Sequence, residues 1–584
     1  MATSISESFV PVADLEQLKA QGCLTAEIEG RTVALFWHDN QVYAVDNRCP
    51  HMGFPLHQGS LRCGILTCHW HHARFDLATG GTFDLWADDV TVFPTRISDG
   101  KVWVDMRPAR ETDLGKHRKR LEHGLKHNLR LVIAKAVLGL EGFGELGHRQ
   151  ALEVGADLGT RHARDGWNAG LTIFTAMANI LPALEASDRP LALYHGLGHV
   201  APMVANQPPL FLPDPLPQAH VEPERLKAWF REFIEVRDSI GAMRVLHTAI
   251  MAGHPLSHLA DMIFAAATDH LYLSGGHALD FANKAFELLQ QVDARFTPQI
   301  LLSVVPVLAN GQRSEESASW RHPIDLANLL TAAFSELPKT LQKARPAPWR
   351  CTPAFLELLL GEDPVAIVEN LQAALLQGAT FEQLAGAVAL AAAHRIAYFR
   401  TSNEFGDWIT VLHSFTYANA VHQAMRRAPS LELLRGVFDG ALSVYLARFL
   451  NTPPAPLPRP LNTIQEPLTA LLDKLNSQNQ VEAVAQQVMT WLAHGGSESE
   501  LLATLGHALL REDAEFHTYQ MVEAGFRQYR DYGNTPEGRV LLVAIARYLA
   551  AHCPTSRANL QTYQVALRLH RGENLYAPED NDSP

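Results

Sequence analysis

The chain has 584 residues, of which 47% are hydrophobic and 19% charged, and its formal net charge is −13. A chain of this length divides into several domains, because one hydrophobic core rarely serves more than about 300 residues. The excess of acidic residues makes the protein a poor general binder of nucleic acid or of anionic lipid surfaces. We therefore expect a multidomain globular protein with no nucleic-acid partner and no membrane partner.

Targeting signals and cysteine usage point to one compartment. No apolar run approaches the ~18 residues that a membrane span needs. The N-terminal residues lack the basic stretch and apolar run typical of a signal peptide. Six cysteines are too few for a disulfide framework in a chain this long. These features indicate a reducing compartment, and we expect a cytoplasmic protein.

Residues 1–106 are predicted to form a small all-β domain. Short runs rich in Val, Phe and Tyr alternate with turn signals, among them Asp39-Asn40 and Asp99-Gly100. Such dipeptides between apolar runs are typical of two-residue hairpin turns.

Two short motifs in this β region have the spacing of a pair of metal-binding loops. Cys49 and His51 form C-x-H and, after an interval of sixteen residues, Cys68 and His71 form C-x-x-H. Two thiolates and two imidazoles can hold the two irons of a [2Fe–2S] cluster, and the imidazoles raise its reduction potential above that of an all-cysteine cluster. The same donors also suit zinc, which is the alternative on donor type alone.

Residues 8–106 resemble the Rieske ferredoxin family, found among the electron-transfer components of ring-hydroxylating oxygenases and in the small subunit of nitrite reductase. The resemblance rests on CPHMG (49–53), the C-x-W-H core (68–71), ARFDLATG (73–80) and Pro94. It implies a [2Fe–2S] cluster whose ligands are Cys49, His51, Cys68 and His71.

The chain departs from the family pattern at His69, where the family usually has Pro, and at His72, where it usually has Gly. Neither residue is in register to be a ligand, so we expect packing or hydrogen-bonding roles. The loops also lack the extra cysteine pair of high-potential Rieske proteins, because Cys63 has no partner at the corresponding place. The resemblance therefore implies a low-potential, ferredoxin-like cluster.

Residues 107–149 are predicted to be a basic linker helix. Nine Lys or Arg residues stand against three acidic residues over 107–135. Two interpretations are open: a solvated linker, or a docking face for an acidic electron-transfer partner.

Residues 150–570 are predicted to form a large all-helical domain, because their apolar positions follow three-to-four spacing over long windows. We expect residues 571–584 to be a disordered acidic tail. A weak internal repeat divides the helical part into units that begin at about 165, 253, 378 and 495.

In these units an apolar helix reaches a polar residue, and a second helix then opens on a histidine. His, Asp and Glu side chains that project inward from several helices can hold iron in helical folds. The alternative is that each is an ordinary packing or surface residue. The candidates for a second site, with additional iron, are His195, His199, Asp269, His277, His394, His413, Glu512 and His517.

Two further comparisons bear on the helical part. The segment 153–162 misses the iron-binding spacing of the α subunits of Rieske oxygenases, and the strands of their catalytic domain are not predicted. Residues 195–205 and 275–289 are faintly similar to the questin oxidase-like family, helical proteins associated with oxidative ring cleavage of aromatic polyketides. This resemblance implies an oxidative role.

Two functional hypotheses follow. In the first, the protein is an oxidoreductase whose cluster accepts electrons from an external reductase and passes them to a helical site that activates O₂ or a small organic substrate. In the second, it is an electron carrier or redox sensor whose helical part is a docking or oligomerisation scaffold. Convergence of the candidate histidines favours the first hypothesis, and their dispersal favours the second.

Overall fold

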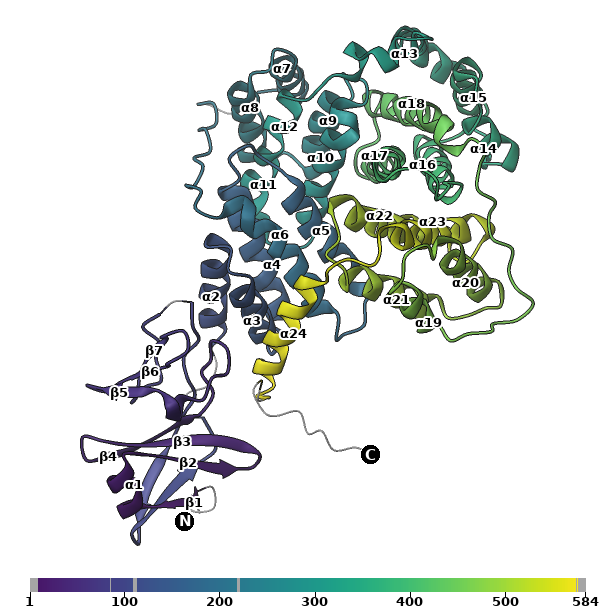
Figure 1. Cartoon of the computed structure of the whole chain (residues 1–584). Coiled ribbons are helices and arrows are strands. Elements are labelled where there is room, and N and C mark those ends of the chain that lie inside the picture. Colours follow the sequence, from purple (N-terminus) through teal and green to yellow (C-terminus); the bar gives the residue numbers. More distant parts are fainter. Residues whose placement is uncertain (1–8, 85, 109–112, 218–220, 574, 576–584) are drawn as a thin grey trace, which may run out of the picture. The chain divides into compact units, whose positions relative to one another are not determined.

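The computed structural model describes residues 9–84, 86–108, 113–217, 221–573 and 575. The chain divides into two compact units, one formed by residues 1–151 with 561–584 and the other by residues 152–560. A small β region precedes a large helical region (Figure 1), which confirms the predicted fold class. The expected tail, 571–584, lies outside the described residues except for 571–573 and 575.

Three antiparallel sheets form the β part of the first unit, together with the short helix α1 (Leu15–Gln21). In spatial order, the first sheet contains β1 (Phe9–Asp14), β10 (Lys101–Asp105) and β9 (Thr95–Ser98). The second contains β2 (Cys23–Ile28), β3 (Arg31–His38), β4 (Gln41–Asp46) and β8 (Val92–Phe93). The third contains β5 (Ser60–Arg62), β6 (Ile65–Thr67) and β7 (Arg74–Asp76).

The two predicted turns lie between paired strands. Asp39 and Asn40, between β3 and β4, have φ angles of 46° and 59°, and Asp99 and Gly100, between β9 and β10, have 52° and 70°. Consecutive left-handed residues match the twist of a two-residue hairpin. The turn chemistry read from the sequence therefore gives the observed strand pairing.

Strand β3 separates two small cores because its successive side chains point to opposite faces. Ala34 and Phe36 belong to a core that includes Cys49 and Cys68. Val33, on the opposite face, belongs to a second core. The two candidate thiols are thus held by the packing of the β unit itself.

The segment 107–149, expected as one basic helix, contains two helices and the start of a third. These are α2 (Leu114–Lys126), α3 (Arg130–Glu141) and α4 (Gly144–Arg161). The chain reverses at Asn128, whose φ is 51°, so that α3 packs against α2, and Gly144, whose φ is 58°, begins α4. Several of the basic side chains pair with acids of the β part, as Lys116 does with Asp89.

The expected domain boundaries at 106, 149 and 570 stay predictions. The remaining helices follow in chain order. They are α5 (Ala169–Ile180), α6 (Arg189–Val204), α7 (Pro223–Glu235), α8 (Ser239–Met251), α9 (Leu256–Ala267), α10 (His277–Leu288), α11 (Thr297–Ser303), α12 (Val305–Ala309), α13 (Leu326–Lys343), α14 (Pro353–Leu359), α15 (Pro364–Leu376), α16 (Phe381–Ala397), α17 (Phe405–Arg427), α18 (Leu431–Leu446), α19 (Ala470–Lys474), α20 (Val481–Ala493), α21 (Glu498–Leu510), α22 (Phe516–Tyr532), α23 (Pro536–His552) and α24 (Ala558–His570).

The three later repeat starts share one local structure. Gly253, Gly378 and Gly495 have φ angles of 77°, 95° and 71°, and each lies three residues before a helix, α9, α16 or α21. A left-handed glycine suits the end of one helix and a sharp entry into the next. The following helices, α10, α17 and α22, contain the candidate histidines, and α17 packs against both of the others. Within the described ranges, no helix combines the length and the apolar character that crossing a membrane requires.

Candidate metal centres

The first candidate loop follows β4 and contains Cys49 and His51. The Cys49 N–H donates to the carbonyl of Phe54 at 2.8 Å, and the Gly53 N–H donates to the carbonyl of Cys49 at 2.7 Å. Gly53 has a φ of 82°, which a residue without a Cβ adopts at little cost. These contacts fold the loop back on itself and leave Cys49 only 2% exposed.

The second candidate loop joins β6 to β7 and contains Cys68 and His71. The Cys68 N–H donates to the Ala73 carbonyl at 2.9 Å, which closes the loop. His72 has a φ of 63°, in the left-handed region where glycine is favoured. This explains why the family pattern has Gly there and identifies His72 as part of the turn. Cys68 is 1% exposed, whereas the His71 side chain is exposed.

The two loops bring the four predicted ligands together. The ring centroids of His51 and His71 are 4.7 Å apart with an interplanar angle of 89°. The thiols of Cys49 and Cys68 share a hydrogen bond, which lowers the pKa of Cys68 to about 6 and raises that of Cys49. Trp86 packs edge-on against His51 at 4.8 Å.

The free ring nitrogen of His51 indicates a missing bond partner. His51 Nδ1 is buried and has no hydrogen-bond partner among the described residues. Burial, followed by the charge of Lys135, lowers the pKa of His51 to about 4. The imidazole is therefore neutral at physiological pH, the form that binds a metal. Two buried thiols and this nitrogen fit the donor set of a [2Fe–2S] cluster.

A lysine from α3 supports the first loop. Lys135 Nζ donates to the carbonyl oxygens of Pro50 and His51, the latter at 2.6 Å, and lies 3.8 Å from Asp88 Oδ2. The side chain is only 10% exposed. Burial lowers the pKa of Lys135 to about 7, and Arg120 acts in the same direction.

In the helical unit, the structure brings together three of the eight candidate residues. His277 begins α10, His413 lies in the middle of α17, and His517 is the second residue of α22. One ring nitrogen from each falls within 4.8 Å of the others. His413 Nε2 and His517 Nε2 are 2.9 Å apart, and the His277 and His413 centroids are 4.6 Å apart.

This group of residues, hereafter the three-histidine cluster, is largely shielded from solvent. Burial is the main cause that lowers the pKa of His277 to about 4 and that of His413 to about 3. Phe281 and Phe516 pack against the His277 ring at centroid distances of 5.4 Å and 5.7 Å. Because their pKa values are low, the imidazoles of His277 and His413 are neutral and available as ligands at physiological pH.

The other five candidate residues make contacts elsewhere. Among the described residues, they do not join the three-histidine cluster. Asp269 pairs with Arg231 and Arg435, and Glu512 with Arg557. His394 lies beside Tyr398, and the rings of His195 and His199 lie against Tyr519. The repeat pattern marked Asp269 and Glu512 because they follow helix ends, where arginine partners rather than a shared centre satisfy them.

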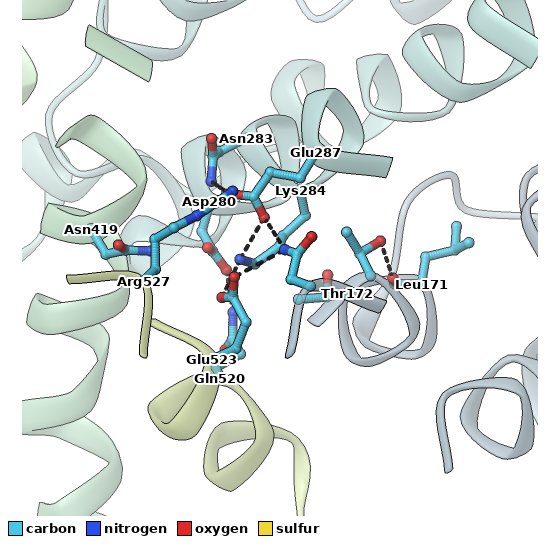
Figure 2. A network of polar contacts seen from close by, with 12 residues as sticks. Leu171, Thr172, Asp280, Asn283, Lys284, Glu287, Asn419, Gln520, Glu523 and Arg527 are labelled. Carbon is cyan, nitrogen blue, oxygen red and sulfur yellow. Dashed lines mark hydrogen bonds and ion pairs between the residues drawn. The ribbon is translucent and has the colours of Figure 1, made fainter. Parts of the chain in front are cut away.

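Next to the three-histidine cluster lies a buried polar column that the sequence analysis missed. Figure 2 shows the facing residues of α10 and α22. Gln520 donates to Asp280, Lys284 pairs with Glu523, and Arg527 pairs with Glu287. These pairs are 240, 239 and 240 residues apart in sequence, so the two helices run in the same direction.

The centre of the column is almost completely inaccessible to solvent, whereas the Arg527 side chain is partly exposed. Lys284, Glu287 and Glu523 are exposed by 1%, 0% and 2%. Burial alone raises the pKa of Glu287, but Lys284 and the arginines outweigh this and hold it below its usual range. Asn179 of α5 donates to both Glu287 and Glu523. The signal in the sequence is polar residues at i, i+3 or i+4, and i+7 on one face of two otherwise apolar helices.

Comparison with known proteins identifies the N-terminal region. Residues 8–94 match the family model for the Rieske [2Fe-2S] domain. The chain is 25% identical over 103 residues to the ferredoxin component of the naphthalene 1,2-dioxygenase system of Pseudomonas aeruginosa, covering 18% of this chain and 99% of that protein. It is 30% identical over 140 residues to oxidoreductase NdmD of Pseudomonas putida, covering 22% of this chain and 24% of that protein.

A solved structure gives a similar match. The ferredoxin of carbazole 1,9a-dioxygenase from Nocardioides aromaticivorans IC177 is 26% identical, with a TM-score of 0.16, over 17% of this chain and 98% of that one. The family match confirms the predicted resemblance. Residues 8–94 are a Rieske domain, and such a domain binds a [2Fe–2S] cluster.

Proposed function

We propose that this protein is a Rieske iron–sulfur oxidoreductase whose N-terminal domain provides single electrons to an oxidative site in the helical unit. Cys49 and Cys68 hold one iron of the cluster, and His51 and His71 hold the other. The bound cluster supplies one-electron transfer, at a potential set by its two thiolates and two imidazoles.

The surrounding residues prepare these four ligands. The buried Nδ1 of His51 is costly to leave unpaired, and a metal bond satisfies it. The core around Cys49 and Cys68 excludes water from the thiolates. Lys135 donates to the carbonyl oxygens of Pro50 and His51 and places a cation behind the loop. The residues of this chain thus orient the ligands and control the charge around them.

The convergence of the three-histidine cluster is the observation that carries the enzymatic half of the proposal. Three imidazoles from helices far apart in sequence meet at one point. A docking scaffold has no need of such an arrangement, whereas a redox site does. The helical unit also contains a cavity of about 1110 Å³, lined in part by Leu390, His394 and Met489, which is large enough for an organic ligand. We assign O₂ or a small organic substrate to this unit.

An external reductase is the proposed electron donor. The sequence has no glycine-rich loop after a strand with nucleotide-binding spacing, so a built-in NAD(P)H or flavin site is not expected. All six cysteines are free of disulfides, which suits a reducing compartment such as the cytoplasm.

The second candidate function is an electron carrier or redox sensor with a helical docking scaffold. Relatives that are themselves small ferredoxin components support it, because they carry the domain without a helical part of this size. It requires no metal beyond the cluster, and this is where the two candidates differ.

Elemental analysis and EPR on protein purified without oxygen test the proposal. The wild type is expected to contain metal in excess of the two cluster irons, and Cys68→Ala is expected to lose the cluster signal while keeping the excess metal. Cys63→Ala is the matched control, because Cys63 is exposed, lies near the same loop and should leave the signal intact. A cluster signal that survives in Cys68→Ala would contradict the ligand set. A wild-type protein that contains only the two irons of the Rieske cluster would favour the second candidate function, an electron carrier or redox sensor with a helical scaffold.

A further inference from the structure

We infer that His277, His413 and His517 bind a single redox-active transition-metal ion, iron or copper. This deepens the proposed function by naming the electron acceptor. The claim that the ion receives electrons rests on that proposal, but metal binding by the three histidines does not and can be measured by itself.

The distances suit one ion. The three donor nitrogens lie within 4.8 Å of one another, and two of them are 2.9 Å apart. Imidazole nitrogens bound at about 2.0–2.1 Å to one ion lie roughly 3–4 Å from each other. Small rotations of the rings therefore bring all three nitrogens to bonding distance without movement of the helices.

Glu515 orients the ligand nitrogen of His517. Its carboxylate accepts a hydrogen bond from His517 Nδ1 at 2.8 Å and from the backbone N–H groups of His517 and Thr518 at 3.0 Å each. Glu515 is the N-cap of α22, so the helix end holds it in place. Because Nδ1 carries the donated proton, the lone pair of His517 is on Nε2 and points at His413. A carboxylate that fixes the tautomer of a histidine in this way is typical of metal ligands.

The donor types narrow the choice of metal. Among the described residues, the group contains three imidazoles and neither a thiolate nor a carboxylate. Imidazole suits zinc, copper, iron and nickel, whereas hard ions such as magnesium and calcium prefer oxygen. Zinc has no accessible one-electron change, so it cannot accept what a Rieske domain delivers. Three protein ligands also leave coordination positions open for an exogenous molecule.

Packing around the three-histidine cluster preserves its geometry. Phe281 and Phe516 cover the His277 ring, and the Gln520–Asp280 pair lies one helical turn further along both helices. A cluster supported on one side by apolar rings and on the other by a buried column of ion pairs and hydrogen bonds is held in one arrangement. The site is therefore organised before any ion binds.

Equilibrium dialysis of the chelator-treated full chain against Fe²⁺ and, separately, Cu²⁺ tests the inference. One ion per chain beyond the Rieske irons is expected, with affinity at least tenfold weaker in His413→Ala and in His277→Ala. His254→Ala is the matched control, since His254 and His258 form another histidine pair, at a centroid distance of 5.0 Å, outside the cluster. It should bind as the wild type does.

Two further readouts keep the test decisive. Circular dichroism and the Rieske EPR signal must be unchanged in each variant, which separates lost binding from lost folding. In the Cu²⁺ form, nitrogen hyperfine structure should report three imidazoles in the wild type and fewer in His413→Ala. Equal affinity and equal hyperfine structure in the wild type and His413→Ala would overturn the inference, whatever happens to electron transfer.

Discussion

His413 and His517 present their Nε2 atoms to each other at 2.9 Å, although 104 residues separate them in the chain. Two lone pairs cannot be held at this distance without a proton or a metal ion between them. Since Glu515 accepts a hydrogen bond from the Nδ1–H of His517, the Nε2 of His517 carries a lone pair, and either a proton on His413 Nε2 or a metal ion lies between the two Nε2 atoms. This relationship underlies the first prediction.

Replacing Glu515 with Gln should weaken metal binding at the three-histidine cluster by about 10- to 100-fold, because an amide holds the His517 tautomer less firmly than a carboxylate does. Dialysis against Fe²⁺ measures the change. Glu404→Gln is the matched control. Glu404 also caps a helix, α17, but its capping box consists of hydrogen bonds with Asp407 and involves no histidine. Equal losses of affinity in both variants would show that helix capping, rather than the carboxylate–histidine contact, is responsible.

The charge of Lys135 should raise the reduction potential of the Rieske cluster, because a nearby cation stabilises the reduced form. Lys135→Gln is expected to lower the potential and Asp88→Asn to raise it, each on the order of tens of millivolts, where 59 mV is a tenfold change for one electron. Spectroelectrochemical titration measures both. Shifts of the same sign would indicate loop distortion, since only a charge effect predicts opposite signs for the two partners.

Lys284 should be essential for the stability of the helical unit. Its removal leaves Glu287 and Glu523 buried and facing one another, and breaking such a buried pair costs about 3–5 kcal/mol. Thermal unfolding of Lys284→Met should therefore show a large drop in Tm. Lys339→Met is the control, because Lys339 pairs with Glu336 at an exposed position and should change Tm little. A Tm for Lys284→Met close to that of Lys339→Met would contradict a role for the column in stability.

Asp280 should make the helical unit less stable as the pH rises. Burial is the main cause that raises the pKa of Asp280 to about 7, with Lys284 lowering it and Glu287 and Glu523 raising it. The folded state therefore keeps a proton that the unfolded state releases near pH 4, so the stabilisation is present at low pH and is lost between about pH 4 and 7. Asp280→Asn should flatten this part of the pH profile of Tm. An unchanged profile would show that Asp280 is ionised throughout.

The sequence was sufficient for features that depend on local chemistry. The hairpin turns at Asp39-Asn40 and Asp99-Gly100, the Cys and His motifs of the β region and the helical character of the later part all follow from short patterns. The exception is the segment 107–149, which was expected to be one helix and contains two helices and the start of a third. The register of the repeat also selected His277, His413 and His517, because these residues open or lie within the second helix of each unit.

The sequence was insufficient where tertiary packing decides which partner a polar side chain contacts. Asp269 and Glu512 share the repeat register but point to arginines rather than to the three-histidine cluster. Lys135 is a further case, because nothing in a basic segment distinguishes a buried lysine behind the cluster loop from the solvated ones around it. A pairwise match of two helix faces, such as that of Lys284 with Glu523, appears only when the helices are placed side by side.

The central claim is that electrons from the Rieske domain reach the three-histidine cluster. Stopped-flow reoxidation of the fully reduced, metal-loaded protein by O₂, followed at the absorbance of the Rieske cluster, tests it most directly. The wild type should reoxidise at least tenfold faster than His413→Ala. His254→Ala should match the wild type, because His254 lies outside the three-histidine cluster. Identical rates in the wild type and in a His413→Ala protein with an intact Rieske signal would contradict the claim.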